Sequence, residues 1–69
     1  MTGTVTETFA YALANWAWAF INGEWLQIDQ SAGADSVTNM FMQLVQARST
    51  GTVVTVGLNS ANHIYYVYY

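Results

Sequence analysis

The chain has 69 residues, of which one is basic (Arg48), four are acidic and eleven are aromatic. A net charge of −3 with a single Arg argues against DNA, RNA and anionic membrane surfaces as partners, because affinity for these polyanions comes from many Lys and Arg side chains. Charged residues are 7% of the chain, against roughly a quarter in an ordinary soluble domain. We therefore expect that another chain covers part of the surface, or that exposed aromatic side chains bind a ligand.

The length fits a single domain over residues 1–69, and a chain this short buries only about 60% of its unfolded surface. There is no cysteine and one histidine, His63, so we expect no disulfide, no metal site and no cofactor. No apolar run approaches the roughly 20 residues of a transmembrane helix. The first eight residues lack the basic start of a signal peptide. Partner chains remain as the stabilising device.

Three strands are predicted in the first half of the chain, over residues 3–12, 16–21 and 24–28, with a turn at 13–15. The second strand alternates side chains with period 2, so that Trp16, Trp18 and Phe20 share one face. Ala17, Ala19 and Ile21 share the other face. Asn22-Gly23 predicts a tight hairpin, because both central turn positions need a positive φ.

A helix is predicted over about residues 36–48. Asp35 or Ser36 is its expected N-cap, and Arg48 lies near the C-terminal end, where the helix dipole favours a cation. Its apolar stripe consists of Val37, Met40, Phe41, Leu44 and Val45. Strands over 52–58 and 63–69 follow, joined by a turn at 59–62.

Three strands, a helix and two strands predict a mainly β (α+β) fold, the five-stranded Greek-key barrel called the OB-fold, with the helix plugging one end. The first strand is long enough to be shared by both halves of the sheet. Ala17 and Ala19 are small enough for the close approach that a tightly curved barrel requires. An open sheet with the helix on one face is the alternative.

The aromatic residues support two interpretations. Aromatic faces stack on the C–H face of a sugar while amides bond its hydroxyls, which makes these residues candidate ligand contacts: Asn15, Trp16, Trp25, Asn59, Asn62 and His63. Alternatively, Trp18 and Phe20 belong to the core and the C-terminal tyrosines alternate between core and interface. Tyr and Trp are enriched at protein interfaces, so we favour the subunit interpretation.

The candidate interface residues lie on the helix and the last strand, at Thr38, Met42, Gln46, Tyr65, Tyr66 and Tyr68. Met42 is apolar on an otherwise polar, uncharged helix side. Helices packed around a pore would favour such residues, because several copies of one charge repel each other. A single exposed Met is the alternative explanation.

Catalysis has little support. A glycosidase needs two opposed carboxylates, and Glu7 and Glu24 could approach each other on adjacent strands. Nothing in the sequence fixes their approach, and His63 has no partner motif for a triad. We therefore expect that the protein is not an enzyme, and a hydrolase using Glu7 and Glu24 is a distant alternative.

Several short patterns resemble the B subunits of the Shiga-type AB5 toxins. The positions that carry the resemblance are Thr2-Gly3-x-Val5; Met40, Leu44, Val45 and Ala47 in the helix; Thr50-Gly51-x-x-Val54-Thr55 with Asn59; and Ile64, Val67 and Tyr68. The resemblance covers most of the chain. It implies an OB-fold, a homopentameric ring that binds cell-surface glycolipid, and secretion with a signal peptide already removed.

The chain departs from that family at the positions that bind sugar. It lacks the family's disulfide, and Leu13-Ala14-Asn15-Trp16 stands where the family has an acidic loop. Val37 or Thr38 takes the place of a Trp at the helix start that stacks on sugar. The resemblance therefore implies the architecture and the ring, and the family's glycolipid contacts do not carry over.

These observations predict a non-enzymatic subunit of a homo-oligomeric ring, a pentamer by resemblance, that binds a cell-surface glycan or receptor multivalently. The alternative is a structural oligomer that holds a second protein chain at its pore and binds no sugar.

Overall fold

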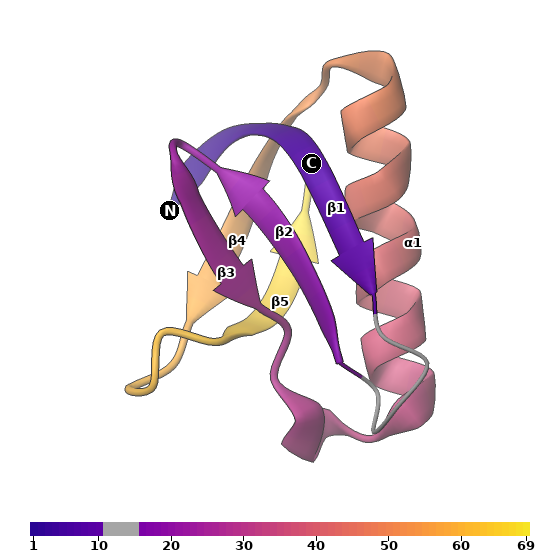
Figure 1. Cartoon of the computed structure of the whole chain (residues 1–69), viewed down its shortest axis with the longest axis vertical. Helices are drawn as coiled ribbons and strands as arrows, with labels where there is room; N and C mark the ends of the chain where they lie inside the picture. The colour runs from indigo at the N-terminus through magenta and orange to yellow at the C-terminus, as the bar shows by residue number, and fades with distance from the viewer. Residues whose placement is uncertain (11–15) are drawn as a thin grey trace.

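The computed structural model describes residues 1–10 and 16–69 of the chain (Figure 1). Its elements are β1 (Thr2–Ala10), β2 (Ala17–Ile21), β3 (Glu24–Gln27), the 3-10 turn η1 (Gln30–Ala32), α1 (Ala34–Thr50), β4 (Val53–Leu58) and β5 (Ile64–Tyr68). The strands form one antiparallel sheet in the order β3-β2-β1-β4-β5. The predicted order of three strands, a helix and two strands is confirmed, and the fold is mainly β. The predicted turn at 13–15 lies outside the described residues.

The long first strand serves both halves of the sheet, as predicted. Residues Thr2 to Thr4 pair with β4, and Val5 to Ala10 pair with β2. The register shifts between Val5 and Glu7, and a bulge of this kind bends a strand and increases its twist. As a result the sheet curls, and β4 and β5 lie behind β1–β3 in Figure 1.

The two ends of the curled sheet meet at one point. Ile28, just after β3, forms a parallel bridge with Ile64 at the start of β5, and the Asp29 N–H donates to the Ile64 carbonyl at 2.9 Å. Within the described residues, β3 and β5 themselves are not paired along their lengths. The sheet therefore approaches the predicted barrel without closing along a full seam.

The Asn22-Gly23 hairpin is confirmed, with φ values of 52° and 80°. Its Asn22 amide also donates to the Thr2 carbonyl at 2.8 Å and so ties the hairpin to the first strand. A Cβ at Gly3 would overlap the Asn22 side chain, so a larger residue there would displace the amide that makes this hydrogen bond.

The helix begins earlier and ends later than the predicted 36–48. The prediction that Asp35 or Ser36 caps it is wrong: Gly33 is the N-cap, and its carbonyl accepts the first helical bond from the Val37 N–H at 3.0 Å. Asp29 caps η1 instead, and this turn delivers the chain directly into the helix. Asp35 lies in the first turn and Arg48 in the last, where the helix dipole favours each charge.

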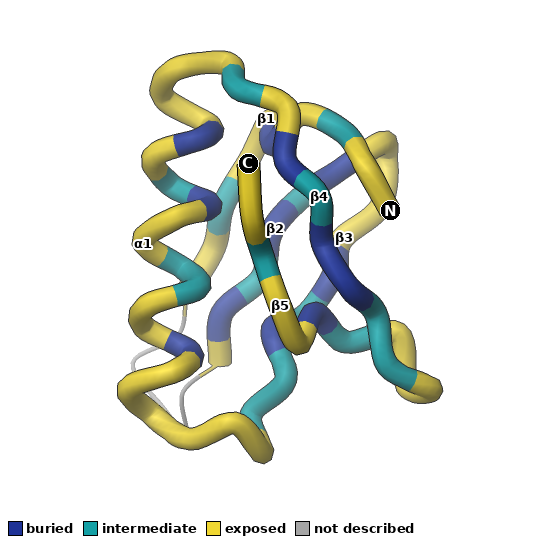
Figure 2. Tube along the Cα trace, turned by 180° about the vertical axis from the view of Figure 1, so that it is seen from behind, coloured by how far each residue is buried: buried dark blue, intermediate teal, exposed yellow. Residues whose placement is uncertain are grey.

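The core lies between the curled sheet and one side of α1 (Figure 2). Its buried residues are Val5, Ala17, Ala19, Ile21, Leu26, Ile28, Val37, Leu44, Ala47, Val54, Val56 and Ile64. Within the predicted helix stripe, Val37 and Leu44 are buried, and Met40 and Phe41 pack against the core. Val45 is half-buried and outside this cluster, and Ala47, which was not predicted in the stripe, is buried instead.

The interpretation that Trp18 and Phe20 belong to the core is wrong. The buried side of β2 carries Ala17, Ala19 and Ile21, whereas Trp18 and Phe20 lie half-buried on the other side. Side chains alternate along a strand, so one face must take the small residues. Ala17, Ala19 and Ile21 fill the inside of the curled sheet against the helix, and the larger aromatic rings lie outside.

Candidate functional site

The outer face of β1–β3 gathers most of the large aromatic side chains of the first half of the chain. Cross-strand register places Phe9 opposite Trp18, and Phe20 opposite Trp25. Directly paired residues share a face, and Trp16 precedes β2 in the same alternation. We call this surface the aromatic face, made of Phe9, Trp16, Trp18, Phe20 and Trp25.

The rings on the aromatic face contact one another. The centroids of Phe20 and Trp25 are 5.1 Å apart with the planes tilted by 59°. Phe9 meets Trp25 edge to face, with centroids 6.5 Å apart and an interplanar angle of 73°. Such arrangements are favourable for aromatic pairs, so the strands hold these rings in fixed relative positions.

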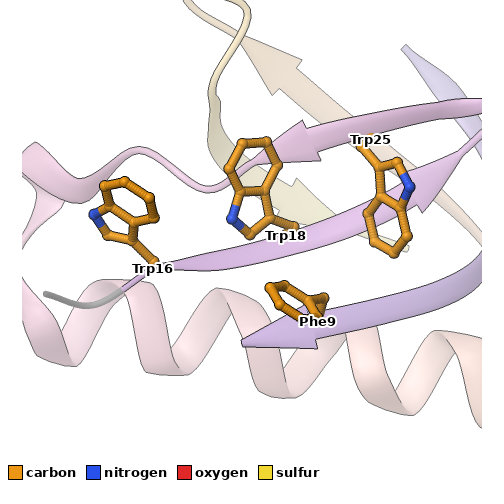
Figure 3. Close-up of a pocket in the computed structure, with 4 residues that line it drawn as sticks. All are labelled: Phe9, Trp16, Trp18 and Trp25. Carbon is orange, nitrogen blue, oxygen red and sulfur yellow. The ribbon is translucent and has the colours of Figure 1, made fainter. Parts of the chain in front are cut away.

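A pocket of about 400 Å³ opens on this face, lined by Phe9, Trp16, Trp18 and Trp25 (Figure 3). The three indoles stand in a row, with Trp18 in the middle and Phe9 beside it from the neighbouring strand. Phe9 and Trp25 are each 45% exposed and Trp16 is 41% exposed. The pocket is therefore walled by aromatic carbon and open to solvent, a form typical of small-ligand sites.

Two polar side chains lie on the same outer face and are not among the described residues that line the pocket. Gln27 is paired with Trp18, and Glu7 is paired with Phe20, so both side chains lie on the outer face at the ends of cross-strand rows. The indole Nε1 of Trp18 is buried and has no hydrogen-bond partner in the part of the chain that the structure describes. An unpaired buried donor costs free energy, so Trp18 lowers the stability of the fold at this position unless a ligand or water accepts from it.

Two of the six predicted ligand-binding residues, Trp16 and Trp25, come together in this pocket. Asn15 lies outside the described residues. Asn59, Asn62 and His63 lie in the turn between β4 and β5 and do not line the pocket.

The β4–β5 turn uses Asn59 to organise its own backbone. The Asn59 Oδ1 accepts from the N–H groups of Ala61 and His63, each at 3.0 Å, and its Nδ2 donates to Asp29 Oδ2 at 3.1 Å. The Ser31 backbone N–H, then its hydroxyl and the Asn59 amide, hold the pKa of Asp29 below its ordinary value. These bonds fasten the turn to the point where the two ends of the sheet meet.

Phe9 lines the pocket but was not predicted as a ligand contact, whereas the sugar-binding interpretation includes Trp18 beside Trp16 and Trp25. For Trp18 the signal was present, because strict alternation places it on the face of Trp16. Phe9 reaches the pocket through its pairing with Trp18 across two strands, and a single sequence does not fix that register.

The predicted interface residues are all exposed and form two groups. Thr38, Met42 and Gln46 follow one another at i, i+4 spacing on the outer side of α1, with Met42 63% exposed. Tyr65, Tyr66 and Tyr68 lie on β5, where the rings of Tyr66 and Tyr68 stack at 6.0 Å and 19°. The β5 tyrosines border α1: shallow hollows run between them, and the Tyr69 hydroxyl donates to the Gln43 carbonyl at 3.2 Å.

Carboxylates are not brought together on one face. Glu7 is paired with Phe20 and Glu24 with Ile21, which point to opposite sides of the sheet. Among the described residues, no three His, Asp or Glu side chains gather as a metal site. No described helix has the length and apolar character needed to cross a membrane.

Comparison with protein-family models, with curated proteins and with solved structures finds no match to this chain.

Proposed function

We propose that the protein is a non-enzymatic binding module with an OB-fold, which assembles as a homo-oligomeric ring and binds a cell-surface glycan through its aromatic face. The strand order and the parallel bridge between Ile28 and Ile64 support the OB-fold, because the bridge joins the two terminal strands of the sheet as closure of a barrel requires. Five subunits is the number that the toxin resemblance implies.

Assembly is supported by the open ends of the sheet. The edges of β3 and β5 are its two terminal edges, and open edges readily pair with another chain. Pairing β3 of one copy with β5 of the next joins two different surfaces, and such a heterologous contact closes as a ring when the rotation allows. The exposed tyrosines Tyr65, Tyr66 and Tyr68 lie on β5, one of the two terminal strands that this contact would pair.

The observation that carries the ligand is the position of the aromatic face outside the core. Aromatic side chains have the largest apolar surfaces to bury, yet Phe9, Trp16 and Trp25 are each more than 40% exposed. The flat rings suit the C–H face of a pyranose, and Gln27 and Glu7 at the rim suit its hydroxyls. Several weak sites on one ring raise avidity by about 10²–10⁴.

Solution mass tests the ring. We expect native mass spectrometry and analytical ultracentrifugation at micromolar concentration to find a multiple of the 7.7 kDa chain, five by resemblance. Tyr68→Glu should dissociate the assembly, because it places one charge in every interface. Ser60→Glu adds the same charge in the exposed β4–β5 turn and should leave the mass unchanged. A folded wild-type monomer would contradict the proposal.

Binding is tested separately on a glycan array. Trp16→Ala should abolish glycan binding without changing the mass of the ring. If the variant breaks the ring, Trp16 belongs to the interface. A stable ring without any glycan hit would favour the second candidate, a scaffold that holds another protein chain at its pore, for which the exposed Met42 on an uncharged stripe is the supporting observation.

A further inference from the structure

We propose that the pocket of Phe9, Trp16, Trp18 and Trp25 is an aromatic cage for a quaternary ammonium group, the trimethylammonium head of a choline carried on the glycan. This inference rests on the proposed function, because it names the chemical group that the same face receives. The cation would occupy the pocket, and the sugar ring would lie beside it, near Gln27 and Glu7.

The lining of the pocket favours a group that forms no hydrogen bonds. The four described residues that line the pocket are all aromatic, and their polar side-chain atoms are the indole N–H groups of the three Trp residues. Gln27 and Glu7 lie on the same outer face. A sugar buried in the pocket would leave several hydroxyls without partners, at a cost of about 1–3 kcal/mol for each such group. A trimethylammonium group has no donors or acceptors to satisfy, so the pocket desolvates it without this cost.

The ring geometry suits a cation. Positive charge is attracted to the faces of aromatic rings, most strongly to Trp, and groups of such rings recognise quaternary ammonium ligands. Three of the four walls are Trp, and the near-perpendicular pair of Phe9 and Trp25 forms two adjoining walls at 73°. A volume of about 400 Å³ is within the usual range for small-ligand pockets, roughly 300–1,000 Å³.

The charges of the chain point to the same ligand. Glu7 lies on the outer face beside the cage, since it is paired with Phe20 and lies two residues before Phe9 on the same strand. The chain carries a net charge of −3, and its single Arg is in the last turn of α1. An anionic sugar would meet an unfavourable field at this face, whereas a cation would meet a favourable one.

Intrinsic fluorescence reports directly on the cage, because the three Trp residues of the chain all line it. We expect choline chloride to quench and shift this fluorescence with saturation in the wild-type protein. The neutral isostere 3,3-dimethylbutan-1-ol has the same shape without the charge and should bind about tenfold more weakly, the size of a cation–π contribution near 1.4 kcal/mol. Equal binding of the two probes would overturn the cation assignment, as would no response to choline.

Variants separate the rings from the charge. Phe9→Leu keeps an apolar wall without the π face and should weaken choline binding about fivefold while leaving the isostere nearly unaffected. Glu7→Gln should weaken choline binding about two- to fivefold. The matched control Asp35→Asn removes the same charge from the first turn of α1, outside the lining, and should leave choline affinity unchanged. An equal loss in Asp35→Asn would show a general charge effect and contradict the role of Glu7.

The outcomes remain distinct from those of the proposed function. Choline binding by a protein of monomer mass would refute the ring and support the cage. A ring that binds neutral glycans, with no competition by choline, would support the proposed function and refute the cage. Sedimentation with phosphatidylcholine vesicles tests the source, and binding there in place of glycan would overturn the assignment to a glycan-linked choline.

Discussion

The two faces of β2 differ in the size and in the burial of their side chains. On the inner face, Ala17, Ala19 and Ile21 are at most 4% exposed and pack into the core. On the outer face, Trp18 and Phe20 carry far more apolar surface but stay half-buried and partly open to solvent. Along this strand, the aromatic side chains are therefore less buried than their smaller neighbours. The inner residues belong to the core, and the outer aromatic side chains are the ones to which we assign binding.

The largest expected effect is on the inner face. Ile21→Ala should lower the free energy of unfolding by about 2–5 kcal/mol, because it removes buried methyl groups and leaves a cavity beside the helix. Denaturant titration followed by circular dichroism measures this. If Ile21→Ala lowers the free energy of unfolding less than the outer-face variant Trp25→Ala does, the inner face is not the more stabilising one.

Overpacking tests how little room the inner face has. Ala19 is fully buried, and Ala19→Leu should cost about 1–3 kcal/mol by forcing the sheet and helix apart. The adjacent outer substitution Phe20→Leu serves as the control, since it alters the neighbouring residue on the opposite face. Ala19→Leu without loss of thermal stability would show unfilled space under β2.

A smaller effect is expected on the outer face. Trp25→Ala removes the contacts with Phe9 and Phe20 and should cost about 1 kcal/mol in stability. Ligand binding should fall much more than stability, by the fluorescence titration described above. If Trp25→Ala destabilises the fold as much as Ile21→Ala, the aromatic face belongs to the core in energetic terms.

The smallest effect concerns the point where the ends of the sheet meet. The pKa of Asp29 is lowered from its ordinary 3.8, chiefly by the Ser31 backbone N–H. The unfolded chain therefore binds this proton more readily, so the stabilisation is complete above the ordinary pKa and is lost as the pH falls through the folded value. Melting temperatures measured from neutral pH to about pH 2 should fall less in Asp29→Asn than in the wild type. If the melting temperatures of the two proteins fall equally with pH, Asp29 does not contribute to the acid sensitivity of the fold.

Local patterns were sufficient for much of the fold. The alternation in β2, the Asn22-Gly23 turn and the apolar stripe of α1 each follow from period and turn chemistry within a few neighbouring residues. The helix cap was predicted wrongly because Asp35 and Ser36 have the right chemistry, whereas Gly33 takes the position through the preceding 3-10 turn. That turn depends on Asp29, whose side chain is also bound by Asn59 from thirty residues away.

The sequence predicted only part of the candidate site. Trp16 and Trp25 were chosen for their residue type, and the structure brings them together with Phe9 and Trp18 through strand register. Asn59 has the chemistry of a ligand contact, but its amide is engaged in the β4–β5 turn. Residue type alone does not separate an amide that binds a ligand from one that binds its own backbone.

By itself, the sequence determined that one face of β2 is aromatic and the other small, because side-chain alternation is a property of the extended backbone. It could not determine which face points inward. Only the tertiary structure decided this: the bulge in β1 curls the sheet, the helix packs inside the curve, and the space left under β2 accommodates Ala17 and Ala19. The aromatic rings lie outside for that reason.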